Sequence, residues 1–159
     1  MLSGGEGLDY GGAHFNVLAP LPEDLSSDEV SDQDSLVMRV NYGRRSILLT
    51  GDLEPRVERQ LVETGGLNRI DVLKVPHHGS RTSTGEVLLE QLRPVWGVIS
   101  AGYANSYGHP HPLLLKRLEE RRATPLRTDQ WGAITILTDG DGMLMDLALW
   151  HPAGRSLLR

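Results

Sequence analysis

The chain has 159 residues, of which 39% are apolar and 23% charged, a composition typical of one globular domain with a sizeable core. It has no cysteine, which excludes disulfides, thiolate metal sites and cysteine nucleophiles, and its net charge of −5 provides no overall basic surface for nucleic acid. No apolar run approaches the roughly 18 residues of a membrane span, and the first residues lack the pattern of a signal peptide.

The N-terminal part of the chain predicts short strands. Residues 1–12 are rich in glycine and are expected to form a flexible lead-in, and residues 13–18 favour a strand. Residues 21–34 carry many acidic and few apolar side chains, which favours a solvated loop over a metal-binding acidic cluster. Residues 35–40 and 46–50 flank a glycine-containing turn and predict an antiparallel hairpin.

Helices and strands then alternate. Apolar residues at helical spacing predict helices at 53–64, 84–92 and 113–122. Apolar or β-rich runs predict strands at 70–75, 95–100, 126–128, 132–138 and 143–149. Pro55 and Pro112 fall where helices begin, since a missing N–H costs nothing there, and Thr84 is a candidate N-cap.

This order of elements predicts the fold class. A hairpin, a β-α-β-α-β unit and a final hairpin form an α/β domain (α+β in some schemes), with a mixed sheet flanked by helices. The domain is expected to span residues 13–150, with 151–159 as a C-terminal tail.

An aspartate and four histidines follow three of the predicted strands. Asp52 follows the first, and His77 and His78 follow the second. His109 and His111 lie in the loop after the third. Ligands of open α/β sheets gather at the carboxyl ends of strands, and carboxylate with imidazole suits zinc, manganese or iron. The three strand ends therefore predict a metal site, in which two bridged ions could activate water and stabilise a departing phosphate oxygen.

Each of these features also has a simpler explanation. Asp52 could cap the following helix. His77 and His78 could be one packed ring and one exposed ring, and His109 and His111 could bond to backbone carbonyls. Three coincidences at strand ends nevertheless favour one common site.

Neighbouring polar residues suggest a phosphate substrate. Ser80, which follows a glycine turn, could hold phosphate through its hydroxyl and backbone N–H groups. Its surroundings are not a Gly-x-Ser-x-Gly elbow, so a serine hydrolase is less favoured. Asn105 could position phosphate, and Tyr107, Arg81 and Arg127 could add phosphate or base contacts.

Four ordered segments together resemble a known family. They are 48–52 (LLTGD), 73–80 (LKVPHHGS), 105–112 (NSYGHPHP) and 127–134 (RTDQWGAI). They are similar to the C-terminal metallo-β-lactamase-like domain of ComEC-type competence proteins, which form the inner-membrane channel for DNA uptake. The similarity extends from about Gly12 to Leu147.

The resemblance implies a metal-dependent hydrolase, a nuclease that uses Mn²⁺ or Zn²⁺ and degrades the DNA strand that is not imported. Asp52 matches the bridging aspartate of the superfamily. His109 matches its last histidine ligand, which stands three residues before a helix-starting proline. The resemblance implies that His77 or His78 is a metal ligand or a catalytic group, and we assign His111 to substrate contacts.

The chain departs from the superfamily pattern in one respect. The main metal motif, His-x-His-x-Asp-His or His-x-Asp-x-Asp-His, is absent, and His14 stands without such partners. The chain therefore resembles the second half of an αββα sandwich.

The resemblance, together with this departure, implies three partners. They are a single strand of incoming DNA, the rest of the membrane channel and a second copy bound through the exposed half-fold face. The resemblance implies a soluble domain on the outer face of the cytoplasmic membrane. The alternative is a non-catalytic module that binds DNA or the channel and has an incomplete metal site.

Overall fold

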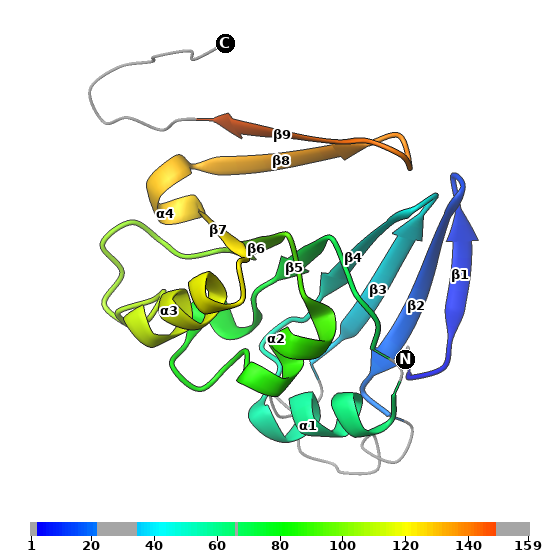
Figure 1. The fold of residues 1–159 in the computed structure, drawn as a ribbon, viewed down its shortest axis with the longest axis horizontal. Helices are drawn as coiled ribbons and strands as arrows, with labels where there is room; N and C mark the ends of the chain where they lie inside the picture. The colour runs from blue at the N-terminus through cyan, green and yellow to red at the C-terminus, as the bar shows by residue number, and fades with distance from the viewer. Residues whose placement is uncertain (1–2, 22–34, 66, 149–159) are drawn as a thin grey trace.

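The computed structural model describes residues 3–21, 35–65 and 67–148, and it contains a seven-stranded mixed sheet (Figure 1). The strands lie in chain order from β1 to β7, antiparallel up to β4 and parallel from β4 onward. They are β1 Gly7–Tyr10, β2 Ala13–Ala19, β3 Val37–Tyr42, β4 Arg45–Leu49, β5 Val72–Lys74, β6 Trp96–Ile99 and β7 Thr124–Arg127. The predicted mixed α/β architecture is confirmed.

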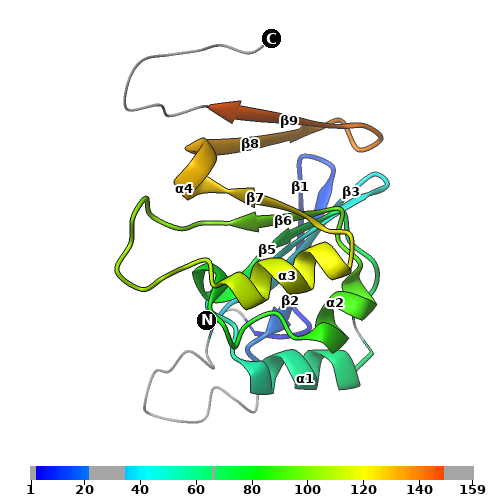
Figure 2. The same ribbon diagram turned by 60° about the vertical axis from the view of Figure 1, so that its left-hand side comes forward.

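Three helices cover one face of this sheet. Parallel crossovers share one hand, so three successive crossovers that step in the same direction place their helices on the same side. The two ribbon views agree with this arrangement (Figures 1 and 2). The helices are α1 Pro55–Glu63, α2 Glu86–Leu92 and α3 Pro112–Glu120, with a 3₁₀ turn η3 at Pro76–Gly79 and a short α4 at Thr128–Trp131.

The main hydrophobic core lies between the helices and the sheet. Leu48, Leu73 and Ile99 reach it from three neighbouring strands, and Leu89 and Leu118 reach it from helices; all five side chains are fully buried. Burial of each such side chain contributes about 1.5–3 kcal/mol. This core holds the carboxyl ends of β4, β5 and β6 at one edge of the sheet.

The opposite face of the sheet carries no helix among the described residues, but it is also apolar. Successive side chains of a strand point to opposite faces, so Val72 faces away from the helices while Leu73 faces them. Val72 and Leu126 are buried, yet they lie outside the main core cluster. On the same face as Val72, Tyr10 of β1 is 78% exposed and Leu49 of β4 is 41% exposed. This second face is therefore only partly covered.

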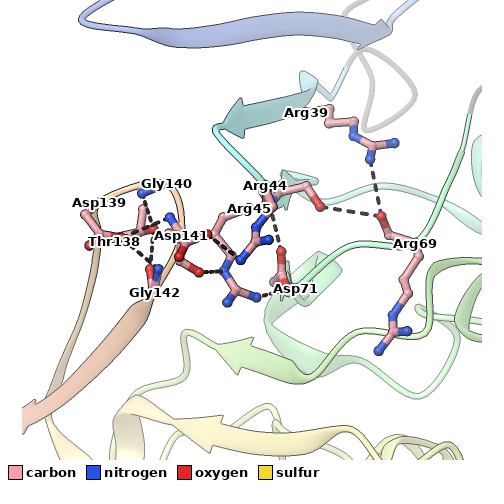
Figure 3. Close-up of polar contacts among 11 residues, drawn as sticks. Arg39, Arg44, Arg45, Arg69, Asp71, Thr138, Asp139, Gly140, Asp141 and Gly142 are labelled. Atoms are coloured by element: carbon pink, nitrogen blue, oxygen red, sulfur yellow. Dashed lines mark hydrogen bonds and ion pairs between the residues drawn. The ribbon is translucent and has the colours of Figure 1, made fainter.

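A separate two-stranded hairpin, β8 Ala133–Thr138 and β9 Met143–Ala148, follows α4. Its turn contacts the turn between β3 and β4 (Figure 3). The Arg44 N–H donates to the Gly140 carbonyl over 2.7 Å, and the Arg45 Nε donates to the Asp141 carbonyl over 2.7 Å. Arg45 also pairs with Asp71 at 3.1 Å, which ties the hairpin to the β4 and β5 end of the sheet.

The two turns approach each other closely because both contain glycine. A Cβ at Gly43 would lie 2.4 Å from the Gly140 carbonyl oxygen, closer than atoms can approach. Gly43 also has φ +56°, in the left-handed region that favours glycine.

The structure changes two details of the predicted fold. The lead-in expected over 1–12 contains strand β1, which pairs antiparallel with β2. The predicted N-cap Thr84 is wrong, because Gly85 occupies the N-cap of α2 without a side-chain bond. Glu58 of α1 instead accepts the N–H groups of Thr84 and Gly85. A capping carboxylate from another helix cannot be identified by local spacing.

Two predicted segments cannot be compared with the structure. Apart from Leu21, the acidic segment 21–34 lies outside the described residues, as does the tail 151–159. Within the part of the chain that is described, no helix has the length and apolar character needed to cross a membrane.

Candidate functional site

Four of the predicted site residues, His77, His78, Asn105 and His109, come together beyond the carboxyl ends of β5 and β6. A cavity of about 400 Å³ opens there. Its lining residues are His77, His78, Ser100, Ala101, Gly102, Asn105, Tyr107 and His109. Three imidazoles that lie far apart in the sequence therefore share one cavity, because parallel strands present their carboxyl ends at a common edge.

The histidine turn after β5 has an unusual backbone. His77 and His78 both have positive φ, at 48° and 52°, in the left-handed region that non-glycine residues seldom adopt. The His77 N–H donates to the Gly51 carbonyl over 3.2 Å, and the Ser80 N–H donates to the His77 carbonyl over 2.9 Å. Consecutive left-handed residues cost free energy and gather at functional sites, so this turn is a candidate site on backbone grounds alone.

The glycine that follows them is required by packing. Gly79 has φ +85°, and a Cβ there would lie 2.8 Å from both Leu114 and Pro110. Its carbonyl accepts the His111 N–H over 2.9 Å. Gly79 thus packs the histidine turn directly against the start of α3.

The His109 ring lies beside two other rings of the cavity wall. Its ring meets that of His77 edge-on at 6.1 Å and lies nearly parallel to the Tyr107 ring at 6.1 Å. Its Nδ1 is buried and has no hydrogen-bond partner. Burial lowers the pKa of the His109 imidazole, and the nearby His77, His78 and His111 lower that pKa further. His109 is therefore held neutral, with an unpartnered nitrogen.

His78, which lines the cavity, lies close to Asp52, which does not. The His78 Nδ1 lies 2.8 Å from the Ser100 carbonyl oxygen, and a carbonyl can only accept, so Nδ1 carries the proton. In the neutral ring Nε2 is then an acceptor, and it lies 3.8 Å from Asp52 Oδ1. Two acceptors so placed can share a proton or a cation.

The structure also bears on the simpler explanation of Asp52. The N-cap of α1 is Glu54, so Asp52 is not the helix cap. The Asp52 backbone N–H donates to Ser35 Oγ over 3.2 Å, which fixes the main chain at this strand end.

The donor set is nevertheless incomplete for a metal ion. Within residues 3–21, 35–65 and 67–148, no three His, Asp or Glu side chains form a group that could hold one. The unpartnered His109 Nδ1 and the pair of acceptors on His78 and Asp52 are suited to a metal individually, but a structural or catalytic site needs three or four ligands together. The described residues alone do not make a metal centre.

Asn105 shapes the loop that carries His109. Its Nδ2 donates to the carbonyls of Gly102 and His109, at 2.9 and 2.6 Å, and its Oδ1 accepts the His109 N–H at 3.1 Å. The amide lines the cavity but is engaged with its own loop.

Ser80 and His111 lie outside the cavity lining. Ser80 is buried, and its hydroxyl accepts the Ser83 N–H at 3.2 Å. His111 is the N-cap of α3, and its Nδ1 accepts the Leu113 N–H at 3.2 Å. Both side chains make local bonds to the backbone, and their assignment to substrate remains a prediction.

The two arginines suggested as substrate contacts lie elsewhere. Arg127 forms a double hydrogen bond with Asp129, at 3.0 and 2.6 Å, so its guanidinium is already paired. The Arg81 side chain is exposed, and its carbonyl accepts from Arg117. Neither arginine lines the cavity.

Sequence reasoning did not single out two residues that support the site. Lys74 ends β5, and its Nζ donates to the Val75 carbonyl over 2.9 Å. Burial lowers the pKa of the Lys74 ammonium, against the opposing effect of Asp52. Thr128 Oγ1 bonds both the N–H and the carbonyl of Ala101, at 2.9 Å each. A lysine in an otherwise apolar strand could have been noticed in the sequence as a candidate site residue. No pattern in the sequence indicates that Thr128 contacts Ala101.

The fold and the cavity define a mixed α/β domain with a histidine cluster at the carboxyl ends of its parallel strands. No protein-family model matches the chain. Among solved structures, CmlA, a diiron β-hydroxylase from Streptomyces venezuelae, is similar over 77% of this chain and 31% of its own, with a TM-score of 0.49 and 16% identity.

Three relatives found by sequence are far more similar to the chain than the CmlA structure is. The chain is 42% identical to ComE operon protein 3 of Bacillus subtilis over 130 residues, 82% of this chain and 16% of that protein. It is 37% identical to Recombination protein 2 of Haemophilus influenzae, over 83% of this chain and 16% of the relative. Competence protein ComA of Neisseria gonorrhoeae is also 37% identical, over 79% of this chain and 18% of that protein.

The chain belongs by sequence to the ComEC-type family of competence proteins, as its ordered motifs predict. It spans only 16 to 18% of the length of these relatives.

Proposed function

We propose that the chain is part of a metal-dependent phosphodiesterase, a nuclease-like domain of a competence DNA-uptake protein. One observation carries the proposal: His77, His78 and His109 share a cavity in which a buried Nδ1 lacks a partner. An imidazole with a free ring nitrogen can accept a proton at a reacting oxygen as a general base, or can bind a metal ion. The substrate we propose is a single strand of incoming DNA, and the reaction degrades the strand that is not imported.

The chain's own residues have distinct parts in this proposal. Asp52 and the His78 Nε2 form a pair of acceptors that binds a cation or orients water. His109, whose buried Nδ1 has no hydrogen-bond partner, would bind the metal ion together with Asp52. His77 meets the His109 ring edge-on and helps to hold its orientation.

A divalent metal ion, Mn²⁺ or Zn²⁺, would need ligands beyond those described, since no group of three donors is present in the described ranges. We propose that the missing donors come from a preceding half of a metallo-β-lactamase-like sandwich. The relatives' much greater length and the partly exposed apolar second face of the sheet support this proposal. In the assembled protein we place the domain on the outer face of the cytoplasmic membrane, next to the channel.

The second candidate is a non-catalytic module that binds DNA or the rest of the channel. The same incomplete donor set favours it. In that case the histidine cavity would bind without hydrolysis.

Metal and activity measurements on the full-length protein that contains this chain, where the missing donors would be present, separate the two candidates. Bound Mn²⁺ or Zn²⁺ is measured by elemental analysis after titration and desalting, and hydrolysis is followed on a labelled single strand. Loss of both properties in an Asp52→Ala, His109→Ala double variant supports the phosphodiesterase. A matched control replaces Asp9 and His14, an exposed pair 2.8 Å apart on β1 and β2, by alanine and should change neither property. Absence of both metal and hydrolysis at excess metal favours the binding module.

A further inference from the structure

Tyr107 is an exposed aromatic residue at the rim of the histidine cavity. It lies in the loop between β6 and α3, lines the cavity and is 83% exposed. One face of its ring lies nearly parallel to His109, with 22° between the ring planes. A large aromatic side chain left in water beside a cavity is a mark of a binding surface.

The loop that carries Tyr107 is anchored at both ends. Thr128 Oγ1 bonds both backbone groups of Ala101 at its start, and Asn105 bonds the backbone of Gly102 and His109. These bonds fix the backbone of the loop on both sides of Tyr107 before any ligand arrives. Preorganisation of this kind reduces the entropy lost on binding.

The cavity wall has no lysine or arginine that would neutralise a phosphate group. Its lining residues include no aspartate or glutamate either. The polar groups present include imidazoles and a serine, which can bond to the edge of a flat heterocycle, whereas the Asn105 amide is engaged with its own loop. The volume of about 400 Å³ lies within the range of small-molecule sites, about 300–1,000 Å³.

We infer that Tyr107 is a base-stacking residue and that the cavity takes one nucleobase of a single strand. The inference rests on the proposed nucleic-acid function and adds to it the mode of recognition. A base within a duplex is already stacked on its neighbours, so the cavity selects unpaired bases. Because stacking replaces phosphate neutralisation, binding depends little on salt, in contrast to proteins that release many counterions.

Binding of short labelled oligonucleotides to the full chain tests this inference, with fluorescence anisotropy as the readout. The probes are oligo(dT) and an abasic oligomer of equal length, each measured from low to high sodium chloride. Stacking on an aromatic side chain predicts that Tyr107→Ala weakens oligo(dT) binding by about 5- to 150-fold. Tyr107→Phe, which keeps the ring, should bind like the wild type. Tyr10→Ala, which removes another highly exposed tyrosine far along the sheet, is the matched control.

The outcomes separate this inference from the phosphodiesterase proposal. Preference for oligo(dT) over the abasic strand, loss in Tyr107→Ala and a shallow salt dependence support the stacking role. Equal binding of both probes, a steep salt dependence, an unchanged Tyr107→Ala variant or no binding at all overturns it. Hydrolysis of the same strands, lost in His109→Ala but retained in Tyr107→Ala, would leave the phosphodiesterase standing while the stacking role fails.

Discussion

Replacement of Glu58 by glutamine tests how the loop beside the histidine turn is held. Glu58 lies on α1, is only 4% exposed, and accepts the N–H groups of Thr84 and Gly85 at 2.5 and 2.8 Å. Arg117 of α3 donates to the Thr84 carbonyl at 3.0 Å. The loop from Ser80 to Gly85 is thus fixed from two helices, directly after the residues that line the cavity.

The expected loss can be worked from these contacts. Glutamine keeps one acceptor oxygen but places an NH₂ group against the second backbone N–H. One charge-assisted hydrogen bond, about 1.5–3 kcal/mol, is lost and a buried N–H is left unsatisfied, about 1–3 kcal/mol. Relief of the cost of burying a charge offsets part of this loss. Glu58→Gln should therefore lower the free energy of unfolding by about 2 kcal/mol, measured by urea denaturation.

The pH dependence gives a second readout for the same variant. Burial raises the pKa of the Glu58 carboxyl above its ordinary value of 4.5, against the hydrogen bonds from Gly85 and Thr84 and the charge of Arg117. The folded state therefore keeps this proton to higher pH than the unfolded state does. The stability from this group is fully present below the unfolded pKa and is lost as pH rises through the raised folded pKa. Between those two values, acidification should stabilise wild type relative to Glu58→Gln.

Glu63→Gln, at an exposed position on the same helix, is the control for charge removal. It should change the unfolding free energy by less than about 0.5 kcal/mol. If Glu58→Gln is as mild as this control, or if its pH profile parallels that of the wild type, the two backbone bonds do not hold the loop as argued.

The remaining predictions concern the turn, the hairpin and the second face of the sheet. Gly79→Ala places a methyl group 2.8 Å from Leu114 at a positive φ, so it should cost at least about 2 kcal/mol in unfolding free energy and disturb the histidine NMR signals; a fully native spectrum would contradict this. Asp71→Asn weakens the pair with Arg45 and should speed hydrogen exchange in β8 and β9 more than in β5; uniform exchange would refute that role. The isolated chain should self-associate in size-exclusion chromatography through the second face of the sheet, and Leu49→Lys should shift it toward monomer. A stable wild-type monomer would count against contact through that face.

Local signals in the sequence predicted most of the fold. Pro55 and Pro112 begin their helices because a proline at the first helical position needs no N–H donor. The apolar run at 70–75 predicted a strand buried on both faces, and Val72 and Leu73 are indeed both buried. In contrast, β1 forms from a glycine-rich segment because it pairs with β2, and pairing partners are not encoded locally.

The sequence likewise predicted only part of the candidate site. The meeting of His77, His78 and His109 followed from the topology, since parallel strands end at one edge. The bonds made by Ser80 and His111 did not, because a serine or histidine beside a turn can bond its own backbone as readily as a ligand.

The topology relates the histidine site to the second face of the sheet. Three crossovers that step in one direction place every crossover helix on one side, and they align the strand ends that carry the histidines. The same arrangement leaves the other face of the sheet without a helix in the described chain, where a hairpin is held at its turn by Arg44 and Arg45. The absence of a three-donor metal group among the described residues and the partly exposed second face therefore favour the same explanation. A structure that covers that face would both complete the apolar layer and be placed to supply the missing donors, so metal binding and burial of the second face should appear together.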